Sequence, residues 1–262
     1  MKKFLKITSI VLALALVVCF AACGGNTEPE ETEAPETETK VLTMATNAEF
    51  PPYEFKEGDG YKGIDVEIAE AIAAKLGMEL KIEDIAFDSI IPGVQTGKYD
   101  MGMAGLTVDE TRLKQVNFSD SYATGVQSII VKEGSDIKSA DDLAGKKIGV
   151  QTSTTGDIYA TDDFGEENIT RYDNGAVAVQ ALMAGKIDCV IIDNAPAKSY
   201  AEANEGLVVL ETEYIQEEYA ICFAKENTQL QADVNKALGE LIADGTVKNI
   251  IEKYIPVEEA AE

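Results

Sequence analysis

The sequence predicts an α/β protein made of two similar lobes, and three observations support that fold class. From Val41 onward, short apolar segments alternate with amphipathic ones, which is typical of a mostly parallel sheet covered by helices on both faces. A length of 262 residues is enough for one large or two medium domains, each with its own core. Residues 94–105 and 182–193 share one sequence pattern, which indicates two units of the same build.

The segment before Val41 has the features of an export signal followed by a tether. A lysine-rich start precedes an apolar run that ends in small residues, so we assign residues 1–22 to a lipoprotein signal peptide. The sequence Phe20-Ala21-Ala22-Cys23 is similar to a bacterial lipobox, in which the Cys is acylated on its sulfur and becomes the mature N-terminus. Phe20 departs from the usual Leu or Val, so cleavage without lipidation of Cys23 stays open. Residues 23–40 are rich in Glu, Thr and Pro and lack bulky apolar side chains, which predicts an unfolded acidic tether.

The elements of the first lobe follow from apolar periodicity and from helix-ending glycines. Apolar residues four apart predict a helix over Ile64–Leu76, and Gly77 supplies its C-terminal stop. Asp88 is expected to cap a short helix that ends at Gly97. The strands expected around these helices are Val41–Thr46 and Leu80–Ala86.

The repeated pattern predicts the same turn in both lobes. A helix ends at Gly97-Lys98 in one copy and at Gly185-Lys186 in the other, and an apolar strand starts at once after each. The two strands break at Gly105 and Asp193. Because ligands of open α/β sheets lie beyond the carboxyl ends of the strands, we expect the functional site in a cleft between the lobes.

The residues that follow Gly105 are expected to bind an anion. Thr107 and Glu110 fit a capping box, so a helix would begin here with free backbone N–H groups at its start. Arg112, about a turn and a half into that helix, could hold a carboxylate with two parallel hydrogen bonds. The alternative is an exposed helix Arg that pairs with Asp109 or Glu110. Gly105 favours the binding site, because a glycine lets a ligand approach the backbone.

The second lobe has a comparable turn that is rich in hydroxyl groups. The strand Lys147–Val150 leads into Gln151 and then into four hydroxyl residues, which end with Thr154 and Thr155 before a helix-like stretch at Ile158–Ala160. Such a turn presents N–H and O–H donors together. Ordinary helix capping, the alternative, accounts for one of these hydroxyl groups.

Asp193 stands alone after a very apolar strand, and two interpretations are open. It either caps the helix that follows or binds a cationic group. Opposite Arg112 and Thr107, it would complete a clamp for a zwitterion, with the carboxylate bound in one lobe and the ammonium group in the other. The aromatic residues of the first lobe that either enclose the rest of such a ligand or join the core are Phe50, Tyr53 and Phe87.

Composition excludes several other functions. The chain has no His, which removes every mechanism with a His base and every His-containing metal site, and we expect neither a metal nor a cofactor. Its 47 Asp and Glu against 22 Lys and Arg give a net charge of −25, which would repel a nucleic acid. Cys189 and Cys222 lie in apolar runs and are expected to be buried thiols, with a disulfide between them as the alternative.

Together, these residues resemble the family 3 extracellular solute-binding proteins, the amino-acid receptors of bacterial ABC importers. The resemblance runs from about Val41 to Pro256. The motifs that carry it are Asn47–Phe55, Gly63–Val66, Phe87–Pro92, Ala104–Thr107 with Arg112, Asn117–Asp120, Asp142–Lys146, Val150–Thr155, Asp193 and Asp244–Thr246.

This resemblance implies a two-lobe, periplasmic-binding-protein-like fold of the second type. Each lobe would be a mixed, mostly parallel sheet flanked by helices. Two hinge crossings, near Tyr122–Val126 and Gln216–Tyr219, would join lobe 1 (residues 41–121 and 220–256) to lobe 2 (residues 122–219).

The same resemblance implies roles for individual residues. The ligand α-carboxylate is assigned to Arg112, Thr107 and the backbone of Gly105, and the α-ammonium group to Asp193. The full set of residues predicted to bind the ligand is Asn47, Phe50, Tyr53, Phe87, Gly105, Thr107, Arg112, Gln151, Thr154, Thr155 and Asp193.

The side chain of the ligand is the least constrained part of the prediction. Relatives that bind basic amino acids commonly have an acid at the position of Asn47, so the amide favours a neutral polar amino acid such as glutamine. A basic or sulfur-containing amino acid stays open, since Glu49 or Gln151 could point inward.

We expect a monomeric receptor without enzymatic activity, held at the extracytoplasmic face of the membrane by its lipid, that passes a free amino acid to an ABC permease. One rival is a cyclohexadienyl dehydratase-like enzyme on the same scaffold, which needs an additional pocket carboxylate as a general acid, with Glu49 as the candidate. The other rival is a sensing module that hands its closed state to a signalling receptor.

Overall fold

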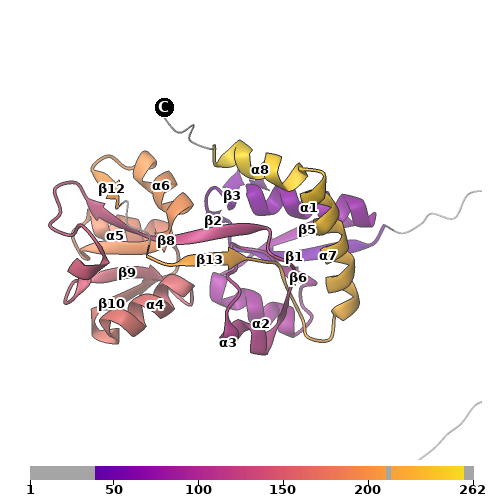
Figure 1. Cartoon of the computed structure of the whole chain (residues 1–262), viewed down its shortest axis with the longest axis horizontal. Helices are drawn as coiled ribbons and strands as arrows, with labels where there is room; N and C mark the ends of the chain where they lie inside the picture. The colour runs from indigo at the N-terminus through magenta and orange to yellow at the C-terminus, as the bar shows by residue number, and fades with distance from the viewer. Residues whose placement is uncertain (1–38, 211–213, 257–262) are drawn as a thin grey trace, which may run out of the picture. The chain divides into compact units, whose positions relative to one another are not determined.

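Two mixed β-sheets, linked by a pair of crossing strands, organise the fold (Figure 1). The computed structural model describes residues 39–210 and 214–256. The predicted signal peptide, the lipidation site Cys23 and all but the last two residues of the tether lie outside the described residues, so these assignments stay predictions.

The first sheet belongs to lobe 1. Its central strand β1 pairs in parallel with β5 and β6, whereas β14 pairs antiparallel with β6 and β7. In spatial order the strands are β5 (Glu79–Asp84), β1 (Val41–Thr46), β6 (Met101–Gly102), β14 (Cys222–Phe223) and β7 (Asn117–Phe118). The helices of this lobe are α1 (Ile64–Leu76), α2 (Ile90–Gln95), α3 (Glu110–Gln115), α7 (Thr228–Ala243) and α8 (Thr246–Tyr254), with the 3-10 turn η1 (Phe87–Ser89). Helices α1, α7 and α8 pack against one another beside the sheet (Figure 1).

The second sheet belongs to lobe 2. In spatial order its strands are β10 (Ile169–Tyr172), β9 (Ile148–Gln151), β11 (Cys189–Asp193), β8 (Ala123–Lys132) and β12 (Leu207–Val209), and β13 (Gln216–Tyr219) also pairs with β8. Its helices are α4 (Thr155–Phe164), α5 (Gly175–Met183) and α6 (Asn194–Ala203), with 3-10 turns η2 (Ala140–Leu143) and η3 (Glu166–Asn168). A small antiparallel sheet in lobe 1 contains β2 (Glu49–Phe50), β3 (Glu54–Glu57) and β4 (Gly60–Lys62).

The two-lobe α/β fold with mixed sheets is therefore as predicted. In both main sheets the outer strands on one side pair in parallel, and each antiparallel pairing between described residues involves β8 or β14. Strand β8 carries the chain into lobe 2, and β14 follows β13, the strand that returns the chain to lobe 1. The sheets take their antiparallel character from this return of the chain.

The crossing strands β8 and β13 lie side by side, with Ala123 opposite Tyr219 and Val126 opposite Gln216. They overlap the two segments that the family resemblance implies as hinge crossings. Between them, Gly125 leaves room for the ring of Tyr219, because a Cβ at Gly125 would lie 2.1 Å from the tyrosine oxygen. A glycine inside a strand often marks such a close approach.

Helix α1 has the bounds that its apolar periodicity predicts. Its inward residues Ile64, Ile68 and Ile72 are fully buried, and Gly77 ends the helix in the left-handed conformation with φ of 66°. Glycine reaches this conformation without the steric cost that a Cβ would add. The strand predicted at Leu80–Ala86 is β5, shifted by one or two residues.

Two predicted helix starts are wrong. Asp88 does not cap α2: it lies inside the 3-10 turn η1, and its carboxylate accepts a hydrogen bond from the hydroxyl of Ser89 next to it. Helix α4 begins at Thr155, three residues before the predicted Ile158, because Thr154 accepts a hydrogen bond from the N–H of Asp157 and caps it.

The repeated turn is present in both lobes. Gly97 and Gly185 have φ of 71° and 70°, and each N–H donates back to the last helical turn. The lysine after each glycine donates its backbone N–H in the same way, Lys98 to Gly93 and Lys186 to Ala181, both at 3.0 Å. This shared geometry supports the two-unit interpretation of the sequence.

The repeat also includes an aspartate that fixes the neighbouring strand. Asp100 accepts hydrogen bonds from the N–H of Thr43 at 2.7 Å and from its hydroxyl at 2.6 Å. In lobe 2, Asp188 accepts one from the N–H of Lys147 at 2.8 Å. In each lobe the aspartate therefore ties the start of its own strand to the adjacent parallel strand.

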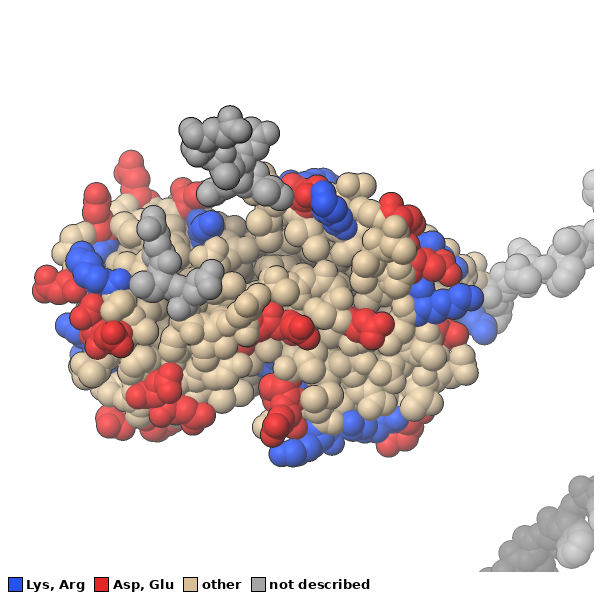
Figure 2. All heavy atoms as spheres, viewed as in Figure 1, with Lys and Arg blue, Asp and Glu red and all other residues tan. Residues whose placement is uncertain are grey.

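The described surface carries the acidic excess of the sequence. Figure 2 shows Asp and Glu side chains over both lobes on the visible face, with Lys and Arg side chains among them. Within the described ranges, no helix combines the length and the apolar character needed to cross a bilayer. Cys189 and Cys222 are free and buried, as expected, and burial raises the pKa of each thiol to about 12.

Candidate functional site

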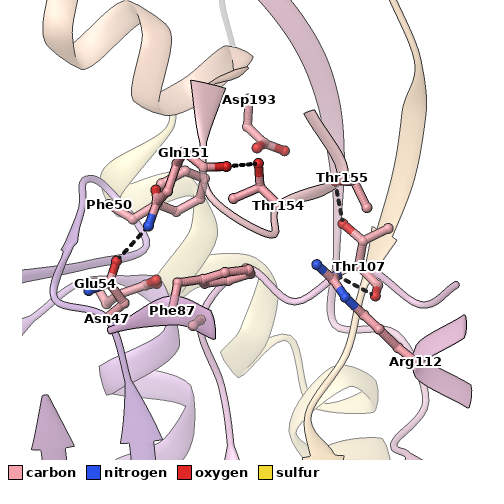
Figure 3. A pocket seen from close by; sticks show the side chains of 12 residues that line it. Asn47, Phe50, Glu54, Phe87, Thr107, Arg112, Gln151, Thr154, Thr155 and Asp193 are labelled. Atoms are coloured by element: carbon pink, nitrogen blue, oxygen red, sulfur yellow. Dashed lines mark hydrogen bonds between the residues drawn. The ribbon is translucent and has the colours of Figure 1, made fainter. Parts of the chain in front are cut away.

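A pocket of about 320 Å³, part of it open to solvent, lies where the two lobes meet (Figure 3). Lobe 1 lines it with Asn47, Phe50, Glu54, Phe87, Ala104, Gly105, Thr107 and Arg112, and lobe 2 with Gln151, Thr154, Thr155 and Asp193. Ten of the eleven residues that the sequence suggests as ligand contacts are in this set, and Tyr53 is the exception.

Arg112 provides the positive charge of the pocket, and its side chain is buried. One terminal nitrogen of its guanidinium donates to the carbonyl of Thr107 at 2.9 Å, and the other to the carbonyl of Ser153 in lobe 2 at 3.2 Å. Its Nε lies 3.2 Å from a carboxylate oxygen of Asp109. The alternative prediction, an exposed Arg paired with an acid of its own helix, is thus right about the pairing and wrong about the exposure. Burial lowers the pKa of Arg112, which the charge of Asp109 partly offsets.

The capping box predicted at Thr107 is wrong. Helix α3 begins at Glu110, and its cap is Asp109, whose carboxylate accepts from the N–H groups of Thr111 and Arg112 at 2.7 and 2.9 Å. Thr107 is instead bridged to Tyr219 of the returning strand. Its hydroxyl lies 3.4 Å from that of Thr155 in lobe 2. As a result, Arg112 lies in the first turn of the helix rather than about a turn and a half into it.

Gly105 lines the pocket but does not present its N–H group there. This N–H donates to Asp65 at 2.9 Å, so it is not free for a carboxylate. The position needs a glycine for two reasons: φ is +52°, and a Cβ would lie 2.9 Å from the ring of Phe50. The predicted close approach of ligand and backbone is compatible with this geometry, whereas donation from the Gly105 N–H is not.

The hydroxyl-rich turn divides its groups between capping and the pocket. Thr154 caps α4 and donates its own hydroxyl to the carbonyl of Gln151 at 2.9 Å, and it also lines the pocket. Thr155 is the first residue of α4 and contacts Thr107 across the lobes. Thr152 does not line the pocket, and its hydroxyl donates to the backbone carbonyl of Tyr172 at 3.1 Å. Because the first N–H groups of a helix have no partner within it, the start of this ten-residue helix favours an anion in the pocket.

Asp193 is a buried carboxylate and not a helix cap. It precedes α6, yet its side chain accepts no hydrogen bond from that helix. It accepts one from the hydroxyl of Tyr219, while the amide of nearby Gln127 donates to Glu217 at 2.9 Å. Burial, reinforced by the charge of Glu217, raises the pKa of Asp193 to about 7. The carboxylate therefore lacks a cationic partner among the described residues around it.

The predicted aromatic residues differ in their positions. Phe50 and Phe87 line the pocket, and the ring of Phe87 lies 5.6 Å from the guanidinium carbon of Arg112. Tyr53 does not: it stacks on Phe50 with ring centroids 5.8 Å apart and meets Tyr219 edge-on at 5.2 Å. The turn between β2 and β3 buries Tyr53 behind Phe50, so its prediction as a lining residue is wrong.

Direct hydrogen bonds join the lobes around the pocket. The amide of Gln151 donates to Asn47 at 2.9 Å, and the Asn47 amide donates to the carbonyl of Ile85 at 3.0 Å. Outside the pocket lining, Tyr200 donates to the backbone carbonyl of Glu49 at 2.7 Å, and Asn174 donates to the Glu49 carboxylate at 2.5 Å. Of the two residues that could decide the side-chain preference, Gln151 thus lines the pocket and Glu49 does not.

Sequence reasoning missed the buried acids near the pocket. Glu54 is fully buried and lines it, and Asp65 and Glu217 lie in the surrounding interior. Glu54 and Asp65 both occur within the motifs used for the family resemblance, between apolar neighbours. A charged residue flanked by residues expected in the core is the one signal that could have indicated them.

Two α/β lobes joined by paired crossing strands, with a pocket where they meet, are the architecture of two-lobe solute-binding proteins. Residues 42–257 match the bacterial extracellular solute-binding proteins, family 3. With that match covering most of its length, the chain belongs to this family.

Individual relatives and solved structures agree with this membership. The chain is similar to the arginine-binding extracellular protein ArtP of Bacillus subtilis (strain 168), with 32% identity over 98% of this chain and 100% of ArtP. It also resembles a solved structure of an ancestral arginine-binding protein bound to glutamine, with 40% identity, a TM-score of 0.79 and coverage of 83% of this chain and 98% of the other. An ancestral arginine-binding protein bound to arginine gives 41% identity, a TM-score of 0.77 and coverage of 82% and 97%.

Proposed function

We propose that the protein is an extracytoplasmic receptor that captures a polar amino acid in the pocket between its lobes and delivers it to an ABC permease. The observation that carries this proposal is the division of opposite charges between the lobes. Arg112 from lobe 1 and Asp193 from lobe 2 are both buried and both line one pocket. An amino acid, with a carboxylate and an ammonium group, complements this pair of charges.

Binding and closure are coupled in this proposal. The ligand contacts both charged groups only when the lobes are together, so it increases the population of the closed state, which the permease recognises. The membership of the family and the names of its relatives support a binding protein rather than an enzyme.

For the side chain of the ligand we favour a neutral polar group such as that of glutamine. The amides of Asn47 and Gln151 lie at the end of the pocket away from Arg112 and can both donate and accept hydrogen bonds (Figure 3). A structural relative that holds glutamine is consistent with this choice. The arginine-binding relatives favour a basic amino acid, which is the second candidate, together with a sulfur-containing one.

The dehydratase-like alternative needs a carboxyl group in the pocket as a general acid. Glu49 does not meet this need, because it is exposed and contacts Asn174 outside the lining. Glu54 does line the pocket, so turnover of prephenate or arogenate by the purified protein would replace the transport proposal.

We further propose that residues 1–22 direct export and that acylation of Cys23 anchors a monomeric receptor through the acidic tether. Two or more acyl chains, at about 0.8 kcal/mol for each buried CH₂, give firm attachment to a membrane.

A thermal-shift screen of the protein against the common amino acids tests the proposed function. Glutamine at about a thousand times its Kd should stabilise the fold by about 4 kcal/mol, which corresponds to a rise in Tm on the order of 10 °C. A basic amino acid that gives the largest shift would select the second candidate. If no amino acid changes Tm, the receptor proposal is wrong.

Ligand affinity is also expected to depend on pH through Asp193. The ligand ammonium group binds the ionised carboxylate, whose pKa is raised to about 7 without that partner. Binding therefore lowers this pKa, so affinity is full above about pH 7 and falls by about tenfold for each unit below it. Isothermal titration calorimetry across this range measures the effect, and a Kd that stays constant through pH 7 would contradict the role of Asp193.

A further inference from the structure

Glu54 is a buried carboxyl group in the pocket that has no donor to stabilise a charge. It lies on β3, is fully buried, and neither of its side-chain oxygens accepts a hydrogen bond from any described residue. In Figure 3, Glu54 and Asn47 lie together at one end of the pocket and Arg112 lies at the other, with Phe87 between them. Glu54 therefore borders the part of the pocket that would take the ligand side chain.

A second buried acid, Asp65, lies beside Glu54. One oxygen of Asp65 accepts hydrogen bonds from the N–H of Gly105 and from the hydroxyl of Tyr122, both at 2.9 Å. Its other oxygen has no donor among the described residues. The carboxyl groups of Glu54 and Asp65 are within hydrogen-bonding reach of each other.

One shared proton gives a partner to one oxygen of each carboxyl group, and it leaves the second oxygen of Glu54 without a donor among the described residues. Two carboxylates in contact in a dry interior repel each other, whereas a carboxylic acid that donates to a carboxylate forms a strong hydrogen bond. Burial, reinforced by the charge of Asp65, raises the pKa of Glu54 well above its ordinary value, and burial raises the pKa of Asp65 to about 6. The titratable groups that act on this pair are acidic or phenolic, with no cation among the described ones: Asp84, Asp193, Tyr53, Tyr122 and Tyr200.

We propose that Glu54 and Asp65 share a single proton, and that the resulting neutral carboxyl group of Glu54 makes the pocket select a neutral polar side chain over a cationic one. This inference rests on the proposed function and deepens it. The role of Asp65 is to hold the proton on Glu54, while its other oxygen orients Gly105 of the pocket and Tyr122 of the hinge crossing.

The charges of the pocket then match a zwitterion with an uncharged side chain. Arg112 and Asp193 balance the α-carboxylate and the α-ammonium group, and a protonated Glu54 adds a hydrogen-bonding group but no charge. A cationic ligand side chain gains an anionic partner at Glu54 only if the proton shared by Glu54 and Asp65 is released. Its binding must therefore release one proton, whereas the binding of glutamine need not.

The test compares the Kd values of glutamine and arginine for the wild-type protein from weakly acidic to alkaline pH. Both ligands present the same α-groups, so the titration of Asp193 cancels in the ratio of the two affinities. Glutamine should bind more tightly at acidic and neutral pH, and the arginine-to-glutamine affinity ratio should rise with pH, with a limit of about tenfold per unit for the release of one proton. Calorimetry in buffers of different ionisation enthalpy should detect that proton for arginine and not for glutamine.

The variant Glu54→Gln keeps the shape of the side chain but holds no titratable proton. It should bind glutamine within about tenfold of wild type, and its affinity ratio should no longer change with pH. Glu57→Gln, an exposed position of the same strand paired with Lys62, is the matched control and should retain the wild-type pH profile. Thermal unfolding of each variant verifies the fold.

Three outcomes would overturn the inference while leaving the receptor in place: a ratio independent of pH in wild type, a ratio that still rises in Glu54→Gln, or tighter binding of arginine at acidic pH. The absence of binding by any amino acid at any pH is a different result, because it rejects the proposed function itself.

Discussion

Replacing Asp193 by Asn should weaken amino-acid binding by about 3 kcal/mol or more, which is at least a hundredfold in Kd. The amide keeps the shape of the side chain and can still accept the hydrogen bond from Tyr219, but it leaves the ligand ammonium group without a counter-charge in a buried pocket. The fold should be retained, since the substitution removes a carboxylate whose burial already disfavours its charged form. Calorimetric titration and thermal unfolding measure the two effects separately.

The control for this variant is Asp188→Asn. Asp188 directly precedes β11, the strand that ends at Asp193. Asp188 is exposed and accepts its hydrogen bond from the backbone of Lys147, remote from the pocket lining. The Asp188→Asn variant should bind the ligand with the affinity of the wild-type protein. Binding of similar strength by Asp193→Asn and by the control would reject the assignment of Asp193 to the ammonium group.

Arg112→Ala should have an effect of similar or larger size, about 3–5 kcal/mol of binding free energy. This substitution removes the counter-charge of the α-carboxylate, and it also removes the hydrogen bond from Arg112 to the Ser153 carbonyl that joins the lobes. Arg112→Lys should recover part of the affinity, because it restores the charge but not the planar pair of donors.

Lys114→Ala provides the comparison for Arg112→Ala, since Lys114 is an exposed cation on the same short helix. Its affinity should stay within about twofold of wild type, because an exposed charge outside the pocket contributes little. The clamp would be refuted if the two alanine variants bound the ligand equally well, or if Arg112→Ala lost its fold along with its binding.

The parts of the fold that follow from local signals were predictable. Helix α1 has both a four-residue apolar periodicity and a terminal glycine, and the structure gives it the predicted bounds. The repeated Gly-Lys turn predicts two units, because it specifies a left-handed glycine in each of them. Asp193 was found for a similar reason, because a lone charged residue at the end of an apolar strand is unusual. Arg112 was found from its place near the start of the helix expected after Gly105.

The errors come from contacts between residues that are distant in the sequence. Thr107 has the local pattern of a helix cap, but its bridge to Tyr219 holds it in an extended conformation, and the cap moves to Asp109. Tyr53 and Glu54 are neighbours on opposite sides of one short segment, and the sequence alone did not indicate which of them lines the pocket. The pairing of Glu54 with Asp65 depends on how β3 and α1 meet, which has no local signature.

The hydrogen bonds of Tyr200 and Asn174 to Glu49 would allow the stability of the closed receptor to change independently of its ligand. Tyr200 and Asn174 of lobe 2 attach to Glu49 of lobe 1 without lining the pocket. Substitutions at these three residues would alter the stability of the closed state and the rate at which the ligand dissociates. They would not alter which ligand the pocket selects. The stability of the closed state and the choice of ligand are thus encoded by separate residues. Either property could change in evolution while the other is preserved.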